Sequence, residues 1–335
     1  DTKQSADVII EGCGLTSIKQ VYGGGNAAAT PGSSVLVKGT KIINELFGGG
    51  NGELGANYAA NVGYHFDAAT GTRSNYTLGD GKALVQLMAG TINYVYGGSN
   101  SNGDIRGGAS ITTPSNDHSA GCCDELVTQQ ISGGGKNADM DSGADIVIDC
   151  RNSSAWVEEI YAGSENADVG GDVRLTITSG KFGRVFGGNK TGGKLNGSIT
   201  VNIEESPTCG IPVVIGELYA GGNKAPYSIY GYSDAGEMLT SGTPKHSNPV
   251  LNVRAFTSIG NIYGGGFGEN AVMYGSPTVN INSVEVDHTD KSNAEFQGNK
   301  YNGETHTIID DPDDSSKNYD VYLYPHDDGK MGVIG

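Results

Sequence analysis

The sequence has few prolines, few basic residues and no long apolar run, and each shortage excludes a class of protein. Only 10 of its 335 residues are proline, and its 55 glycines follow no Gly-X-Y period, which excludes a collagen triple helix. No run of 18 apolar residues occurs, so no transmembrane segment is expected. The 21 basic and 38 acidic residues give a net charge of −17. A surface this acidic repels phosphate groups, so we expect no nucleic-acid partner.

Cysteine is also scarce, and the five copies lack Cys-x-x-Cys spacing. An odd number in this pattern fits neither a disulfide framework nor a zinc site. Cys150 continues the inward-facing series of Ile146 and Ile148, which indicates a small buried apolar side chain. Cys122 and Cys123 are adjacent, so a strained vicinal disulfide between them stays open as an alternative.

A motif of the form apolar-x-x-apolar-aromatic-small-Gly recurs eight times. The aromatic positions are 22, 47, 96, 132, 161, 186, 219 and 263, although the fourth copy has Ser132 in place of the ring. Self-similarity of this kind identifies a repeat architecture. The shortest interval, 25 residues, sets the length of one repeat.

Apolar and polar residues alternate upstream of most copies, most clearly in Val173–Thr178 and Ile199–Glu204. Such alternation predicts a strand with one buried face. Two strands and a Gly-rich corner are too few for a propeller blade of about 40–45 residues, and the leucine-rich-repeat scaffold is missing. The sequence therefore predicts an all-β fold, a right-handed single-stranded parallel β-helix of about 8–10 rungs.

The corners account for the glycines, because a chain that leaves a strand sharply needs positive φ, which glycine and asparagine adopt most readily. If the rungs stack in register, the aromatic residues form a ladder, and so do the asparagines beyond each glycine pair. These asparagines are Asn26, Asn51, Asn100, Asn189 and Asn223.

The longer intervals place additional residues between a Gly corner and the next alternating strand, at 51–80, 99–121 and 224–248. Insertions at one corner lie on one side of a solenoid, which is often its binding side. Aromatic side chains in two of them suit stacking on sugar rings or partner proteins, or alternatively pack the loops onto the solenoid wall. The candidate ligand-binding residues are Tyr58, Tyr64, Phe66, Tyr227, Tyr230 and Tyr232.

The motif stops after Ile281, so we expect a solenoid domain over 1–283 and an acidic cap or tail over 284–335. Between Glu285 and Lys330 the chain has 12 acidic residues and four lysines. An open solenoid end would template aggregation, which favours a cap. A linker or a partner-binding segment is the alternative.

Many β-helices degrade polysaccharides, but the polygalacturonase motifs Asn-Thr-Asp, His-Gly and Arg-Ile-Lys are absent, and Asp287-His288 is an isolated partial match to pectate lyases. Glycosidase carboxylates lie about 5–9 Å apart, a separation that neighbouring rungs at ~4.8 Å permit almost anywhere. We therefore expect no identifiable catalytic residue, no cofactor, and only incidental Ca²⁺ on acidic surfaces.

The aromatic-Gly-Gly corners that follow β-rich rungs from Val8 to Ile281 resemble the adhesin-like parallel β-helix surface proteins of gut Bacteroidetes. The resemblance implies an extracellular or cell-surface location, with the signal peptide removed. It also implies a non-catalytic role in binding a glycan or a protein on a host or neighbouring cell. The alternative is a polysaccharide lyase or glycoside hydrolase of β-helix type whose site the sequence does not identify.

Overall fold

The computed structural model describes residues 5–53, 58–67, 69–113, 126–149, 156–204, 213–256 and 258–281. Four short backbone segments at 306–310, 318–322, 324–325 and 331–332 are described as well. The chain is all-β over these ranges, with no α-helix among them. In this part of the protein no helix is long and apolar enough to cross a membrane.

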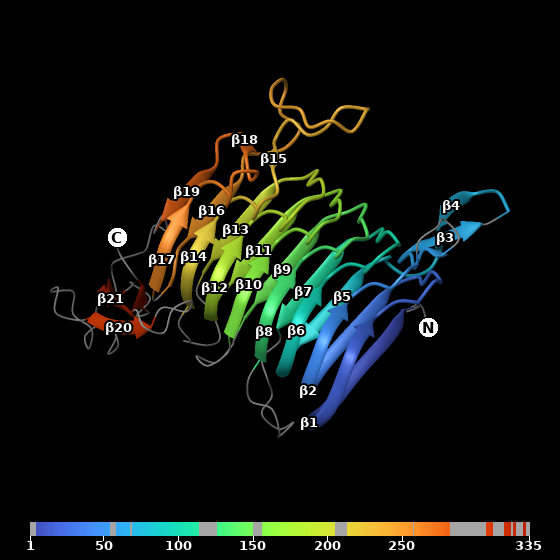
Figure 1. The fold of residues 1–335 in the computed structure, drawn as a ribbon, viewed down its shortest axis with the longest axis horizontal. Helices are drawn as coiled ribbons and strands as arrows, with labels where there is room; N and C mark the ends of the chain where they lie inside the picture. The colour runs from blue at the N-terminus through green and yellow to red at the C-terminus, as the bar shows by residue number, and fades with distance from the viewer. Residues whose placement is uncertain are drawn as a thin grey trace.

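Each repeat contributes two strands, and equivalent strands of successive repeats pair in parallel (Figure 1). The first-strand layer contains β5 (Ala83–Leu87), β7 (Ala109–Thr113), β9 (Ala144–Ile148), β11 (Val173–Ile177), β13 (Ile199–Ile203), β16 (Val250–Val253) and β19 (Thr278–Ile281). The second-strand layer contains β6 (Gly90–Tyr96), β8 (Leu126–Ser132), β10 (Trp156–Tyr161), β12 (Gly180–Phe186), β14 (Val213–Tyr219) and β17 (Ser258–Tyr263). The long strands β1 (Ala6–Tyr22) and β2 (Ser33–Phe47) run through both layers.

A third line of contacts runs along the remaining side of the repeats as single parallel bridges. It joins Thr30, Val62, Ile105, Met140, Val169 and Leu195 in turn. Side chains from all three sides meet in one continuous apolar core, because the alternating strands turn Val, Ile and Leu inward at every second position. The arrangement is consistent with a parallel β solenoid, as the repeat predicted.

The register aligns the repeats residue by residue, so that Tyr22, Phe47, Tyr96, Ser132, Tyr161, Phe186, Tyr219 and Tyr263 form one row. We number the repeats one to eight by these positions. Most of the difference in length between repeats lies in the connections, because the paired strands keep this register; β1 and β2 are the exception, with register shifts at Ile10–Glu11 and Gly12–Ser17.

The corner glycines serve a different purpose from the one the sequence suggested. Positive φ occurs at glycines elsewhere, such as Gly52 and Gly103, but not at the two that follow each aromatic position. Those two are close-approach positions: a Cβ added to Gly98 would lie 2.5 Å from the amide nitrogen of Gly135 in the next repeat. Backbone bonds also join the corners, for example Gly98 N to Gly134 O at 3.0 Å. The glycines let the corner backbones stack on one another.

The predicted insertions are only partly single loops. The range 99–121 contains β7, a regular first strand, so it is not one inserted segment, and its residues from 114 onward lie outside the described chain. The range 51–80 contains Val62, which belongs to the third line of bridges, followed by an antiparallel hairpin of β3 (Tyr64–Asp67) and β4 (Thr72–Asn75). The range 224–248 begins with β15 (Tyr227–Ser228), which pairs with β18 (Met273–Tyr274).

The cysteine interpretation is wrong in one respect, since Cys13 is disulfide-bonded. The other four cysteines, including Cys150 and the Cys122–Cys123 pair, lie outside the described residues.

Beyond residue 281 two small antiparallel pairs are described, β20 (His306–Asp310) with β21 (Asn318–Tyr322) and β22 (Tyr324–Pro325) with β23 (Met331–Gly332). Strand β21 contacts β17, the last strand of the second-strand layer. The predicted division between a solenoid and a tail at residue 283 stays a prediction.

Candidate functional site

The outer face of the second-strand layer carries a row of polar side chains, one from each repeat. We call this row the strand row, and register places its members side by side. They are Gln20, Glu45, Tyr94, Gln130, Glu159, Arg184, Glu217 and Asn261. The row is the largest set of aligned ionisable groups on this layer, and is therefore the first candidate for chemistry.

The aromatic row lies two residues further along each strand, and its rings stack face to face. Ring centroids are 5.0 Å apart for Tyr22 and Phe47 and 4.9 Å for Phe47 and Tyr96. Beyond Ser132 the stack resumes from Tyr161 to Tyr263 with separations of 4.7–4.8 Å. The predicted aromatic ladder is thus confirmed in two segments.

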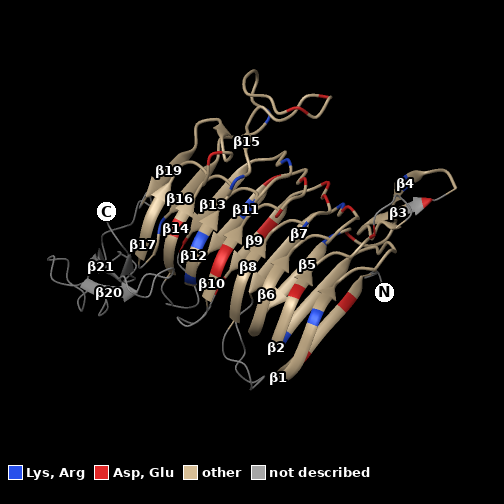
Figure 2. Ribbon diagram, viewed as in Figure 1, with Lys and Arg blue, Asp and Glu red and all other residues tan. Residues whose placement is uncertain are grey.

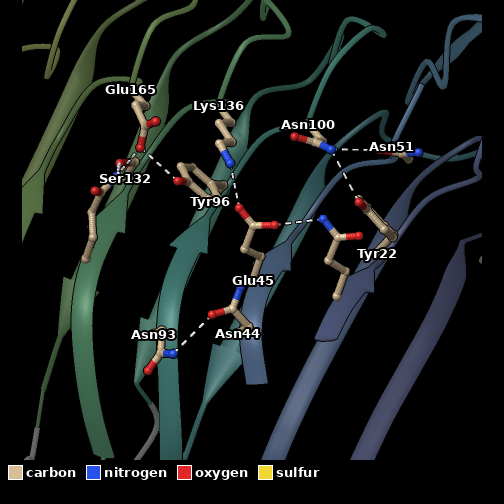
Figure 3. A network of polar contacts seen from close by, with 12 residues as sticks. Tyr22, Asn44, Glu45, Asn51, Asn93, Tyr96, Asn100, Ser132, Lys136 and Glu165 are labelled. Atoms are coloured by element: carbon tan, nitrogen blue, oxygen red, sulfur yellow. Dashed lines mark hydrogen bonds and ion pairs between the residues drawn. The ribbon is translucent and has the colours of Figure 1, made fainter. Parts of the chain in front are cut away.

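A third row, the corner row, follows the glycine pair and reaches back over the aromatic rings (Figure 3). Each of its central members contacts a residue two repeats earlier. The contacts are Asn100 to Tyr22 (3.3 Å), Lys136 to Glu45 (2.5 Å), Tyr96 to Glu165 (2.8 Å), Lys190 to Gln130, and Asn223 to Tyr161 (3.0 Å). These contacts cover the rings, so Phe47, Tyr96, Tyr161 and Phe186 are at most 1% exposed. The aromatic ladder is therefore a structural element and offers no free ring face over this stretch.

The predicted asparagine ladder exists in the first three repeats only. Asn51 donates to Asn26 at 2.7 Å, and Asn100 donates to Asn51 at 2.8 Å. Asn189 instead accepts from the amide of Ser164, and Asn223 donates to the hydroxyl of Tyr161. The difference arises because the corner row changes to Lys136, Glu165 and Lys190 in the middle repeats.

The gap at Ser132 is filled by Gln130, the only member of the strand row that is almost fully buried, at 1% exposure. Its amide donates to Ser132 Oγ at 2.9 Å and to Glu165 Oε2 at 2.8 Å. Glu165 also accepts from Tyr96 (Figure 3). Lys190 contacts Gln130 from the next repeat but one. A missing ring thus allows a polar network to enter the ladder.

The carboxylates of the strand row are all engaged. Glu45 accepts from Lys136 and from Gln20, Glu159 pairs with Arg184 and Lys190, and Glu217 accepts from Tyr219 at 2.8 Å. Burial raises the pKa of Glu45, but the bonds from Lys136 and Gln20 outweigh it and hold that pKa below its ordinary value. A general acid in glycoside hydrolysis needs a raised pKa. The row is therefore better suited to holding repeats together than to proton transfer.

The predicted ligand-binding aromatics lie elsewhere, in the connections that follow the Gly corners of repeats two and seven. Tyr58 is 52% exposed. Tyr64 begins the β3–β4 hairpin and donates to Asp141 at 2.5 Å, and burial together with this bond raises the pKa of Tyr64 to about 12. The side chain of Phe66 lies outside the part of the chain that the structure describes.

The three tyrosines of the last insertion differ in position. Tyr227 is 2% exposed, belongs to the apolar core and donates to Gly197 O at 2.8 Å, so it offers no surface for a ligand. Tyr230 packs against the core and is half-buried. Tyr232 lies under Lys194, whose Nζ is 5.5 Å from the ring centroid, and burial raises the pKa of Tyr232 to about 12. Of the two alternatives that the sequence left open, Tyr227 follows the second, because it packs the loop onto the solenoid.

Two segments depart from the regular connection, and they do so at the same corner. In repeats three and four, three residues separate the third-side residue from the first strand, as from Ile105 to Ala109. Repeat two reaches this length without residues 64–80, because Gly63 bonds Thr30 O and Gly81 bonds Pro31 O. In repeat seven the chain leaves the solenoid after Ile229, whose amide donates to Tyr274 O, and returns at Asn248, whose Oδ1 accepts from Ser276 N. We call residues 64–80 the first arm and 230–247 the second arm.

Acidic residues accompany this edge between the two arms, as Figure 2 shows. Asp104, Asp139 and Asp168 flank the third-side residues of repeats three to five. Burial is the main cause that raises the pKa of Asp104; neighbouring carboxylates raise it further, and Arg73 lowers it in part. Burial also raises the pKa of Asp139. No group of three or more His, Cys, Asp or Glu in the described ranges is placed to hold a metal ion.

Comparisons with protein families, with curated proteins and with solved structures find no match for this chain.

Proposed function

We propose that the chain is a right-handed parallel β-helix that binds a glycan or a partner protein, without catalysis, through its two arms. The observation that carries this proposal is that both arms leave the solenoid at one corner, in repeats two and seven. Five repeats at ~4.8 Å put their bases roughly 24 Å apart on the same edge. Figure 1 shows both arms projecting from that edge. Loops on a rigid scaffold are where binding residues concentrate.

The right-handed form follows from the general preference of parallel connections, since strand–crossover–strand units are right-handed in nearly all proteins. An extracellular location is supported by the bond at Cys13, because disulfides persist in oxidising compartments. The net charge of −17 suits a soluble exported protein.

A β-helix lyase or hydrolase is the second candidate, and the strand row is where its site would lie. Its carboxylates are engaged in ion pairs and hydrogen bonds, and the lowered pKa of Glu45 is opposite to that of an acid catalyst. The geometry therefore favours binding through the arms.

Excision of the arms tests the proposal, because the residues on either side of each arm are bonded to the solenoid. Removal of 64–80, of 230–247 or of both is expected to leave the far-UV circular dichroism of the solenoid unchanged and to abolish binding on a glycan array and to cultured cells. The matched control is the triple variant Glu45→Gln, Glu159→Gln, Glu217→Gln, which should bind like the wild type. Binding that survives loss of both arms, or product release from polysaccharides that the triple variant abolishes, would contradict the proposal.

A further inference from the structure

The first arm contacts the solenoid through a small set of polar groups. Arg73, near the middle of β4, bridges two repeats: one guanidinium nitrogen contacts Asp104, and the other lies 2.8 Å from Asp141. The guanidinium carbon also lies 4.0 Å from the ring centroid of Tyr64, which itself bonds Asp141. Arg73 thus occupies a cage of two carboxylates and one aromatic ring.

Apolar packing contributes little to this attachment. Residues Thr72–Asn75 are all exposed, and neither Tyr64 nor Tyr76 belongs to the apolar core. Near the base, Gly63 N donates to Thr30 O, Gly81 N donates to Pro31 O, and Gly81 O accepts from Gly107 N. Arg106 Nη2 also lies 3.3 Å from Gly79 O, and Tyr76 Oη lies 3.4 Å from Ala29 O. Both glycines have positive φ, 87° at Gly63 and 69° at Gly81, and they mark the points where the arm leaves and re-enters the solenoid.

The charges beneath the arm are mainly negative. Asp139 and Asp168 continue the row of Asp104, with Arg106 and Lys194 as the nearby cations. Solvent ions reach the bridge, because the side chains of Arg73, Asp104 and Asp141 keep 36%, 32% and 39% of their surface exposed. Exposed ion pairs are screened by salt, with a Debye length that falls from about 30 Å at 0.01 M to about 3 Å at 1 M.

We infer that the first arm is an ion-held strap: the Arg73 bridge to Asp104 and Asp141 fixes it against repeats three and four, and screening or removing that bridge releases it about Gly63 and Gly81. Release uncovers the two carboxylates and frees the hairpin that carries Tyr64. This inference concerns the position of the arm relative to the solenoid, and it does not depend on what the arm binds.

Hydrogen exchange of the whole 335-residue chain, read by mass spectrometry, tests the strap. An isolated two-stranded hairpin is marginally stable in water, so a released arm exchanges its β3 and β4 amides faster. Two exposed ion pairs and a cation–π contact correspond to a change of about tenfold in the exchange rates of residues 64–76. We expect this acceleration in Arg73→Gln and a smaller one in Arg73→Lys, because a lysine cannot bridge both carboxylates. In the wild type, exchange should accelerate when NaCl is raised from 0.01 M to 0.5 M.

The matched control is Asp145→Asn, which removes an exposed carboxylate from β9 in the same repeat as Asp141. It should leave the arm as slow as in the wild type. Exchange in β11 and β13, read in the same samples, separates release of the arm from general unfolding. The inference is overturned if Arg73→Gln leaves residues 64–76 as protected as the wild type, or if β11 and β13 accelerate to the same extent. Neither result depends on whether arm excision abolishes binding.

Discussion

At the scale of single residues, Thr128 is a polar exception in an apolar row. It pairs in register with Val157, is 1% exposed, and its hydroxyl has no hydrogen-bond partner within the described chain. An unpaired buried polar group costs about 1–3 kcal/mol. We therefore expect Thr128→Val, which keeps the shape of the side chain, to raise the free energy of unfolding by about 1 kcal/mol.

Urea denaturation measures this change, with Thr112→Val as the control. Thr112 lies on β7, and its side chain points outward and is half-buried, so the same substitution should be nearly neutral there. A loss of stability in Thr128→Val would show that the hydroxyl is satisfied after all.

The Glu45–Lys136 pair makes a prediction about pH. Because the folded protein holds the pKa of Glu45 below its ordinary value, the pair stabilises the fold at pH values above the ordinary pKa and loses its contribution as pH falls through the folded pKa. Lys136→Met is thus expected to destabilise the protein at pH 7 and to differ much less from the wild type at pH 3. Chemical denaturation at both pH values, repeated on Glu45→Gln, measures the effect. An equal loss at both values would mean that the lysine acts through packing alone.

At the scale of elements, the contribution of each ring in the aromatic ladder to the free energy of unfolding depends on its position in the stack. Phe186 is fully buried between Tyr161 and Tyr219, whereas Tyr263 ends the stack and is 41% exposed. We expect Phe186→Ala to lower the free energy of unfolding by about 3–5 kcal/mol. Tyr263→Ala, which loses one stacking neighbour and little burial, should cost about 1 kcal/mol. Thermal and urea denaturation compare the two, and similar losses would contradict an energetic role for two-sided stacking.

The sequence predicted these elements well because strands and ladders follow from strict local periods. Alternation in Val173–Ile177 gives a half-buried strand, and the same place of Phe47 and its equivalents within the repeated motif gives a stack. The sequence did not predict features that depend on contacts between neighbouring repeats. Gln130 fills the place of the ring missing at Ser132, and Gly98 is required because a Cβ there would lie too close to Gly135. Both features arise from the stacking of two repeats and cannot be read from either segment alone.

The sequence indicated the side on which the arms lie but not their boundaries. The interval lengths indicated insertions on one side, but only the register shows that residues 64–80 and 230–247 are additional, whereas Tyr227 and β7 belong to the regular solenoid. Arg73 could not be identified from the sequence, because its partners Asp104 and Asp141 lie one and two repeats away.

At the scale of the whole molecule, each repeat is stabilised by its neighbours, so the ends of the solenoid are its weak points. Strands β17 and β19 end the two layers, and Ile281 on β19 is 48% exposed. Since β21 contacts β17, we expect a chain cut after residue 283 to keep its β circular dichroism but to self-associate through open strand edges. Light scattering coupled to size-exclusion chromatography measures the association. Ile281→Lys in the cut chain should reduce it, because a charge on an edge strand opposes pairing. A cut chain that stays monomeric at high concentration would show that the tail is not a cap, and would favour its alternative role as a linker or a partner-binding segment.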